Sequence, residues 1–263
     1  MAIGNKQIGW SQEENLLWEI SRQLDNMTSI MCTGPCPATT TSTTTAALTT
    51  TTTTTAPILN RFEYNTGFAP SLAGFEEIIG FSLTDGVKTG DVITFSNSGY
   101  SVPAFAFNTN SNLISVDTLA TIVNVQGFRL CTNLVYFSAP ILAAVLNGAF
   151  AFNSSILSYN IPNLITIGAG CFIGNSLVTS FSFPLATTLA SVIFDDCINV
   201  TSFDLSSVTD LGGSVGDNNV FRDIIGNNIT ITIPTAIMTA NAGSPDGDII
   251  ELQTNNTVTI ITV

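Results

Sequence analysis

The sequence predicts a mainly β protein, most of which is a solenoid of short repeats stacked along one axis. The first observation is a period of 22 residues that runs through residues 111–233. The second is that four columns of residues keep this period in phase: Phe128, Phe150, Phe172 and Phe194; Phe137, Tyr159, Phe181 and Phe203; Pro140, Pro162 and Pro184, continued by Ser206; and Cys131, Asn153, Asn175 and Cys197. Fixed periods of about 20–50 residues are typical of solenoids.

Each repeat is expected to contain a short strand, a turn at the proline and a second apolar segment that leads through small residues to the next phenylalanine. Residues 177–184 alternate as a strand and end at a proline, which stops the hydrogen-bond ladder, and residues 165–172 show the second half. We expect the aromatic columns to form the core. The asparagines should satisfy backbone groups through their amides, with Cys131 and Cys197 as small apolar substitutes.

The C-terminal part departs from the strict period. Phe221 falls five residues beyond the position that the first aromatic column requires, and residues 212–218 are the expected insertion. Residues 230–234 predict one last strand of the solenoid. Residues 249–253 and 257–263 predict strands in a C-terminal cap over 234–263, joined through turn-rich residues 241–248.

Residues 58–110 lack the period and predict a cap over the open N-terminal edge of the solenoid, which would otherwise expose its core. Residues 72–79 are compatible with a short helical segment. Residues 91–96 alternate as a strand, and residues 88–91 have the composition of a turn before it.

The N-terminal 37 residues predict an anchor with a helix over 11–31. Ser11 and Glu14 form a capping box. Apolar side chains follow at heptad spacing, which favours association with copies of the same helix, preferably as a homotrimer: Trp10, Leu17, Ile20, Leu24, Met27 and Met31. The alternative is a helix that packs on its own downstream domain.

Two further segments follow this helix. Cys32 and Cys36 have the spacing of a zinc half-site or redox pair, but Gly34 and Pro35 between them also suit the end of a helix, which we favour. Residues 38–57 are almost pure threonine, which disfavours helix. We interpret this tract as an extended stalk within an oligomer, with a flexible linker or an O-glycosylated segment as alternatives.

Charge and composition exclude several classes of protein. Six basic residues stand against 19 acidic ones, giving a net charge of −13, so a phosphate-binding surface for nucleic acid is not expected. The chain shows neither a basic amphipathic face nor an apolar run long enough to insert into a membrane. Because no secretory signal is visible, we expect synthesis in a cytoplasm without a signal peptide, and release only by lysis or by a route that the sequence does not show.

The sequence offers little for catalysis, and we expect neither an enzyme nor a cofactor. The chain contains no histidine, so serine or cysteine nucleophiles lack their usual base. Asp195 and Asp196 are adjacent, but neighbouring residues should point apart and be solvated. Asp246, Asp248 and Glu251 form a weak candidate calcium site, for which an ordinary turn is the favoured alternative.

Two resemblances add to these expectations. The repeats resemble BspA-like leucine-rich repeats through Gly148-Ala149-Phe150, Gly168 with Phe172, and residues 131–134, although Asn replaces Cys at 153 and 175. This resemblance implies a curved leucine-rich-repeat-like solenoid used for binding or adhesion. Residues 8–24 have the sequence Ile-Gly-Trp-Ser-Gln-Glu-Glu-Asn-Leu-Leu-Trp-Glu-Ile-Ser-Arg-Gln-Leu. This string resembles the leading segment of virion proteins in crAss-like bacteriophages of Bacteroides, which implies a fibre tethered to the particle.

Three functions follow as hypotheses. The favoured one is a phage virion fibre, on the capsid rather than the tail, that binds major capsid or other virion proteins through its N-terminus and host-surface glycans or proteins through its repeats. The second is a bacterial BspA-like adhesin, which predicts a signal peptide or sorting motif. The third is a carbohydrate-degrading β-solenoid, which predicts a carboxylate cluster on one face.

Overall fold

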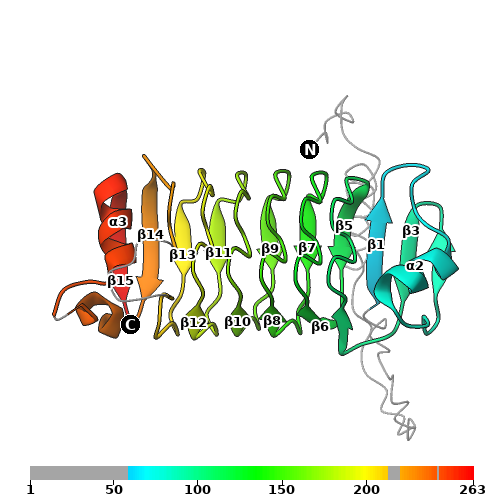
Figure 1. The fold of residues 1–263 in the computed structure, drawn as a ribbon, viewed down its shortest axis with the longest axis horizontal. Coiled ribbons are helices and arrows are strands. Elements are labelled where there is room, and N and C mark those ends of the chain that lie inside the picture. The colour runs from blue at the N-terminus through cyan, green and yellow to red at the C-terminus, as the bar shows by residue number, and fades with distance from the viewer. Residues whose placement is uncertain (1–58, 213–219, 242) are drawn as a thin grey trace, which may run out of the picture. The chain divides into compact units, whose positions relative to one another are not determined.

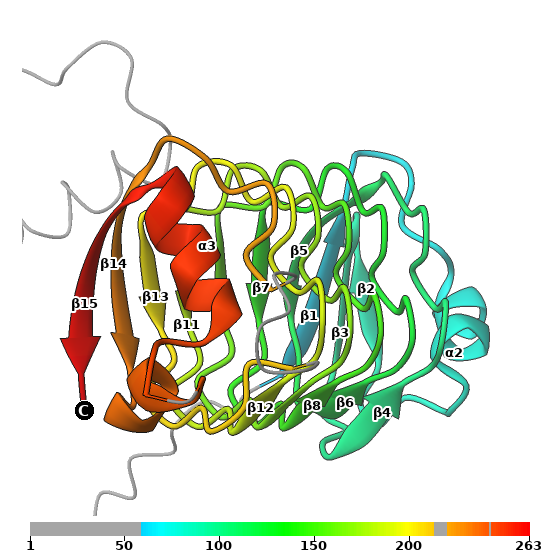
Figure 2. The ribbon, with the colours of Figure 1, turned by 60° about the vertical axis from the view of Figure 1, so that its left-hand side comes forward.

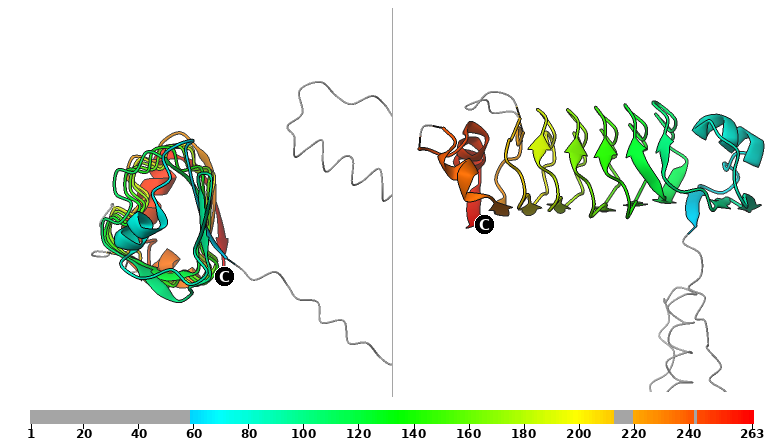
Figure 3. Two further views of the ribbon diagram at one scale, coloured as in Figure 1. Left: turned by 90° about the vertical axis from the view of Figure 1, so that its right-hand side faces the viewer. Right: turned by 90° about the horizontal axis from the view of Figure 1, so that it is seen from below.

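The structure, a computed structural model, describes residues 59–212, 220–241 and 243–263 (Figures 1–3). The expected helix over 11–31, the Cys32–Cys36 segment, the threonine tract and most of the expected insertion lie outside the described residues.

The repeats form a stack with parallel strands along two sides (Figure 1). One side carries one strand per repeat and runs on to the C-terminal end of the chain: β5 (Leu113–Asp117), β7 (Tyr136–Ser138), β9 (Ser158–Asn160), β11 (Ser180–Ser182), β13 (Ser202–Asp204), β14 (Asn228–Ile233) and β15 (Thr257–Thr262). The second side is a sheet of shorter strands: β4 (Tyr100–Val102), β6 (Ala120–Val123), β8 (Ala144–Val145), β10 (Thr166–Ile167) and β12 (Thr188–Leu189).

The strand register reproduces the sequence period. Phe137 pairs with Tyr159, Phe181 with Phe203, and Thr166 with Thr188, each a step of 22 residues between parallel strands. Seen along the axis, successive repeats superimpose as one closed outline (Figure 3). The predicted mainly β solenoid is therefore confirmed.

The third side of each repeat consists of consecutive turns rather than a strand. Backbone N–H groups there alternate in direction: Phe150 donates to Cys171 of the next repeat at 3.0 Å, whereas Ala151 donates back to Gly148 at 3.1 Å. One position in each turn has a left-handed backbone, with φ of 58–70° at Leu130, Phe152, Gly174, Asp196 and Asp223. This conformation is costly for residues other than glycine, and the hydrogen bonds between repeats offset the cost.

The aromatic columns fill the interior. Phe107, Phe128, Phe150, Phe172, Phe194 and Phe221 stack with ring centroids 4.8–6.2 Å apart and planes within 12° of parallel. The second column, from Phe137 to Phe203, packs edge-on against the first, for example at 4.6 Å between Phe137 and Phe150. Stacking of Phe221 on Phe194 shows that the column resumes after the longer fifth repeat, as the sequence predicts.

The stack begins earlier than the strict period indicates. Phe107 lies 21 residues before Phe128, so it escapes a search for steps of 22, yet it stacks on Phe128 at 4.8 Å. Likewise β4 belongs to the sheet of shorter strands, although residues 58–110 were assigned from sequence to the cap.

The proline column forms the corner after each long-side strand. Pro140 is the second residue of a β-turn in which Leu142 N–H donates to Ala139 O at 3.1 Å, and Pro162 and Pro184 repeat this geometry. Proline has no N–H to satisfy. Ser206, which replaces it in the next repeat, does have one, and the carboxylate of Asp204 accepts from it at 3.3 Å.

The mixed Cys/Asn column is buried and hydrogen-bonded. The Cys131 thiol donates to Phe107 O, the Asn175 amide to Phe150 O, and the Cys197 thiol to Phe172 O, each at 3.1 Å. Asn153 accepts the N–H of Cys131 at 2.8 Å, so the predicted role of the asparagines is confirmed. The prediction that the cysteines are merely apolar substitutes needs correction. Each thiol donates to a phenylalanine carbonyl oxygen, as the side-chain amide of Asn175 does in its own repeat.

The N-terminal cap consists of β1 (Asn60–Tyr64), α2 (Leu72–Ile79), β2 (Val87–Thr89) and β3 (Val92–Phe95). β1 pairs antiparallel with β5 and extends the long side, and α2 lies over the end of the stack (Figure 1). The predicted helical segment and the strand over 91–96 are confirmed. The turn predicted over 88–91 is wrong in part, because Lys88 and Thr89 lie in β2 and only Gly90 and Asp91 turn.

The C-terminal cap contains η1 (Thr235–Thr239), α3 (Gly247–Asn255) and β15. The strand predicted over 249–253 is wrong, since these residues lie in α3, which crosses the end of the stack (Figure 2). The side chain of Asp246 accepts from Asp248 N–H at the helix N-terminus, and Ile249 and Leu252, three residues apart, face the core. The predicted strands β14 and β15 are confirmed. None of the helices in the described ranges is long and apolar enough to cross a membrane.

Candidate binding surface of the repeat domain

The outer surface of the long side is a regular polar array, here called the polar face. One residue of each strand points into the core, so its two neighbours on the strand point to the other side of the sheet. The inward residues are Val116, Phe137, Tyr159, Phe181, Phe203 and Ile231. The polar face comprises these neighbours on β5 to β14: Ser115, Asp117, Tyr136, Ser138, Ser158, Asn160, Ser180, Ser182, Ser202, Asp204, Thr230 and Thr232. Ser115 and Ser138 are buried, and the other ten are half-buried or exposed. Pairing within β5–β7–β9 and within β11–β13–β14 places them in two rows with a step of about 4.8 Å in each sheet, and the hydrogen-bond ladder is interrupted between β9 and β11.

Side chains of the polar face bond to one another across strands. Asn160 Nδ2 donates to Ser138 Oγ at 3.0 Å, and Ser182 Oγ donates to Asp204 Oδ2 at 3.3 Å. These bonds hold the array in place while its exposed hydroxyl and amide groups remain free to donate and accept. The array is hydroxyl-rich, and only two of its twelve residues are charged.

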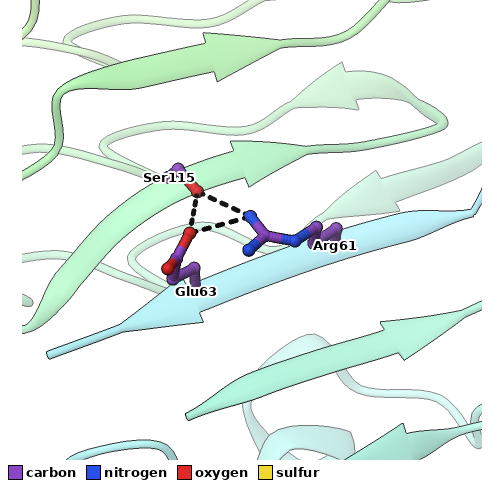
Figure 4. A network of polar contacts seen from close by, with 3 residues as sticks. All are labelled: Arg61, Glu63 and Ser115. Carbon is purple, nitrogen blue, oxygen red and sulfur yellow. Dashed lines mark hydrogen bonds and ion pairs between the residues drawn. The ribbon is translucent and has the colours of Figure 1, made fainter. Parts of the chain in front are cut away.

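A bridging network closes the polar face at its N-terminal end (Figure 4). Arg61 Nη1 lies 2.8 Å from Glu63 Oε2 and donates to Ser115 Oγ at 3.0 Å, and Ser115 Oγ donates to Glu63 Oε2 at 2.9 Å. The hydrogen bond from Arg61 lowers the pKa of Glu63, so this carboxylate stays ionised. The network fixes β1 of the cap to β5 of the first repeat.

Apolar side chains border part of the polar face. Val135 and Leu157, just before β7 and β9, are 41 and 58 % exposed, and Tyr136 within the polar face is 38 % exposed. Exposed aromatic and aliphatic groups beside hydrogen-bonding rows give a surface that can contact both the apolar and the polar faces of a ligand.

The residues that the sequence predicts to be most important do not lie on the polar face. The aromatic columns lie in the core and present no chemistry to solvent, and the predicted anchor residues lie outside the described ranges. Cys131, Cys171 and Cys197 are free and buried, and burial raises the pKa of the Cys131 and Cys171 thiols to about 12. Thiols with so high a pKa stay protonated at neutral pH and are poor nucleophiles.

The expectation that Asp195 and Asp196 point apart into solvent is wrong in part, because Asp196 is exposed but Asp195 is not. Asp195 is buried and its Oδ2 forms an ion pair with Arg222. One carboxylate oxygen each of Asp195, Asp196 and Asp223 lie within 4.8 Å of one another. The sequence held a signal for this cluster, because Arg222 and Asp223 follow Phe221 as Asp195 and Asp196 follow Phe194.

The weak calcium candidates are not gathered into one site. Asp246 caps α3, and Asp248 Oδ1 accepts from Val220 N–H at 2.7 Å. Glu251 lies elsewhere, in the electrostatic field of Asp223 and Asp195. Their roles in the described structure are to start α3 and to fix it to the fifth repeat.

Comparison with known proteins identifies the repeats. No curated protein gives a match. A leucine-rich repeat protein of Bacteroides ovatus ATCC 8483, known as a crystal structure, is similar over 67 % of this chain and 67 % of its own, at 12 % identity and a TM-score of 0.25. Residues 100–224 match the family described as the BspA type leucine-rich repeat region, in six copies. The solenoid therefore has a leucine-rich-repeat-like fold, and its residues 100–224 are similar to BspA-type leucine-rich repeats.

Proposed function

We propose that the protein is a structural component of a phage virion, a fibre attached to the particle by its N-terminus that presents the repeat domain for adhesion. The repeat domain is consistent with an adhesin-like or BspA-like protein, as leucine-rich repeat proteins typically bind rather than catalyse. The virion assignment rests on the resemblance of residues 8–24 to phage virion proteins.

The observation that carries the adhesive function is the polar face. Its serine, threonine and asparagine side chains can both donate and accept hydrogen bonds, as the hydroxyl groups of a glycan require. Its repeated step of about 4.8 Å offers the same contact several times, so weak individual contacts add up when the ligand is itself repetitive. Host-surface glycans or proteins are the proposed ligands.

Attachment and assembly belong to the N-terminal segment in this proposal. Residues 1–37 bind the major capsid protein or another virion protein and associate as a homotrimer, and the threonine tract forms the stalk. Mass measurement of the full chain at micromolar concentration, with and without residues 1–37, tests the association. An oligomer that becomes a monomer on deletion supports it, and a full-length monomer contradicts it.

Antibodies against the repeat domain test the virion assignment. Gold-labelled antibodies are expected to decorate the capsid surface of purified phage particles in electron micrographs. Label on the tail would instead support the alternative of a tail fibre or tail-associated protein.

A BspA-like bacterial adhesin is the second candidate, and the family match of residues 100–224 favours it. It predicts that the same antibodies label bacterial cells that carry no phage and leave particles unlabelled. That outcome would contradict the virion assignment while keeping the adhesive function.

A further inference from the structure

A carboxylate cluster lies where the fourth and fifth repeats meet α3. It contains Asp195, Asp196 and Asp223, whose nearest oxygens lie within 4.8 Å of one another. Asp195 is buried, with 6 % of its side chain exposed, whereas Asp196 and Asp223 are open to solvent. The cluster is separate from the polar face, since it lies on the turn side of the repeats.

Two oxygens of this region are buried without a partner. Among buried side-chain nitrogen and oxygen atoms of the described residues, the carboxylate oxygens that lack a hydrogen-bond partner are Asp195 Oδ1 and Glu251 Oε2. Arg222 binds the other oxygen of Asp195, so it leaves Oδ1 unsatisfied. A buried carboxylate oxygen without a partner is destabilising, and a cation or ordered water removes that cost.

The local charge points to a cation rather than to water. Four carboxylates, those of Asp195, Asp196, Asp223 and Glu251, stand against the single guanidinium of Arg222, which lies 3.6 Å from Asp223 Oδ2. The arginine therefore does not balance the negative charge of this region.

We propose that the cluster is a calcium site, with Asp195 Oδ1, Asp196 and Asp223 as protein ligands and water completing the shell. Calcium takes six to eight oxygen ligands and tolerates irregular geometry, which suits carboxylates from two consecutive turns. The exposed side of Asp196 and Asp223 lets the ion enter with its waters. Bound calcium joins the fourth repeat to the fifth and reduces the repulsion that Glu251 of α3 experiences.

Calorimetric titration and thermal unfolding of the full chain test the proposal. Calcium is expected to bind once per chain with a Kd of about 10⁻⁴–10⁻³ M, the range of extracellular calcium modules. A calcium concentration near 100 times Kd is expected to raise the Tm by about 5–10 °C. Sodium chloride at equal ionic strength should not reproduce this rise. Absence of binding at 10 mM calcium, or an equal rise with sodium chloride, overturns the proposal.

Paired variants test the location. Asp196→Asn with Asp223→Asn removes two exposed ligands and is expected to abolish the calcium-dependent rise in Tm. The matched control, Glu77→Gln with Asp85→Asn, removes two exposed carboxylates from the N-terminal cap and should keep the full rise. Calcium binding that survives in the first pair, or is lost in the control, contradicts the assignment.

Arg222→Gln separates a calcium site from a simple ion pair. The variant loses the partner of the buried Asp195, so its Tm in calcium-free buffer should fall. If the cluster binds calcium, removal of the competing guanidinium tightens the Kd, and calcium restores the Tm. A lowered Tm that calcium does not restore indicates an ion pair only and overturns the proposal.

Discussion

The two ends of the repeat stack are closed by different means. At the N-terminal end, β2 is an edge strand of three residues that carries Lys88 and pairs antiparallel with β3. At the C-terminal end, the parallel sheet continues into β15, a six-residue edge strand without charge or proline, on which Ile261 is 47 % exposed. Short, charged edges are the usual protection against unwanted strand pairing. The N-terminal end has that protection, and β15 lacks it.

The interiors of the two ends differ as well. The N-terminal cap adds Phe62, Phe75 and Phe95 to the aromatic column, with 4.9 Å between the rings of Phe62 and Phe75. The C-terminal cap adds the aliphatic residues Ile249 and Leu252 and depends on polar contacts at the start of α3. The comparison indicates that the N-terminal end is packed with aromatic side chains and the C-terminal end with aliphatic ones, while both ends also contain buried polar contacts.

The largest expected effects come from core truncation at each end. Phe75→Ala should lower the free energy of unfolding by about 3–5 kcal/mol, and Leu252→Ala by about 2–5 kcal/mol, because both side chains are fully buried. Chemical denaturation of each variant measures these losses. A greater loss for Leu252→Ala than for Phe75→Ala would contradict the packing comparison.

Loss of one polar contact at each end should have a smaller effect. Asn60 is a buried hub whose amide donates to Phe95 O at 3.0 Å and accepts from Leu119 N–H at 2.6 Å, so Asn60→Ala should cost about 1–3 kcal/mol. Asp246→Ala removes the cap of α3 and should cost about 1 kcal/mol. Hydrogen exchange should localise the second loss to α3, and exchange that rises evenly through the repeats would argue against the assigned role of Asp246.

The smallest effects on the Tm are expected when either of two glutamates is replaced. The two effects have opposite signs, and both depend on pH. The pKa of Glu63 is lowered from 4.5 mainly by its hydrogen bond with Arg61. The ionised carboxylate therefore stabilises the fold above pH 4.5, and this stabilisation is lost as the pH falls through the pKa of the folded state. The pKa of Glu251 is raised from 4.5 mainly by burial, so stability is lost as pH rises through its folded pKa. In calcium-free buffer at neutral pH, Glu63→Gln should therefore lower the Tm slightly and Glu251→Gln should raise it. Both differences should shrink in acid, and a pH-independent difference would contradict this explanation.

Much of the repeat scaffold could be predicted from sequence, because the period of 22 residues reports directly which side chains stack. Phe107 was missed because a step of 21 breaks the period while the ring still reaches Phe128. The helix α3 was assigned as strand because Ile249-Ile250 has high strand propensity, whereas the Asp246 cap and the pairing of Asp248 with Val220 favour helix. The cluster of Asp195 with Arg222 and Asp223 was missed because the longer fifth repeat separates residues that occupy equivalent positions.

The polar face was anticipated only in composition. Sequence indicated that serine, threonine and asparagine lie between the core columns, but strand register within each sheet determines that they form two rows on one side. Register between repeats is a tertiary property, and the sequence period alone does not state which outward residues share a row.

Cell binding by polar-face variants tests the central claim most directly. Fluorescent full-length protein with Tyr136→Ala and Asn160→Ala, both exposed on the polar face, is compared with a Thr166→Ala, Thr188→Ala control on the sheet of shorter strands. The account predicts at least a tenfold loss of binding to host cells for the first variant, about 1.4 kcal/mol or more, and unchanged binding for the control. Equal binding by both variants, with folds unchanged by circular dichroism, would contradict the assignment of the polar face as the adhesive surface.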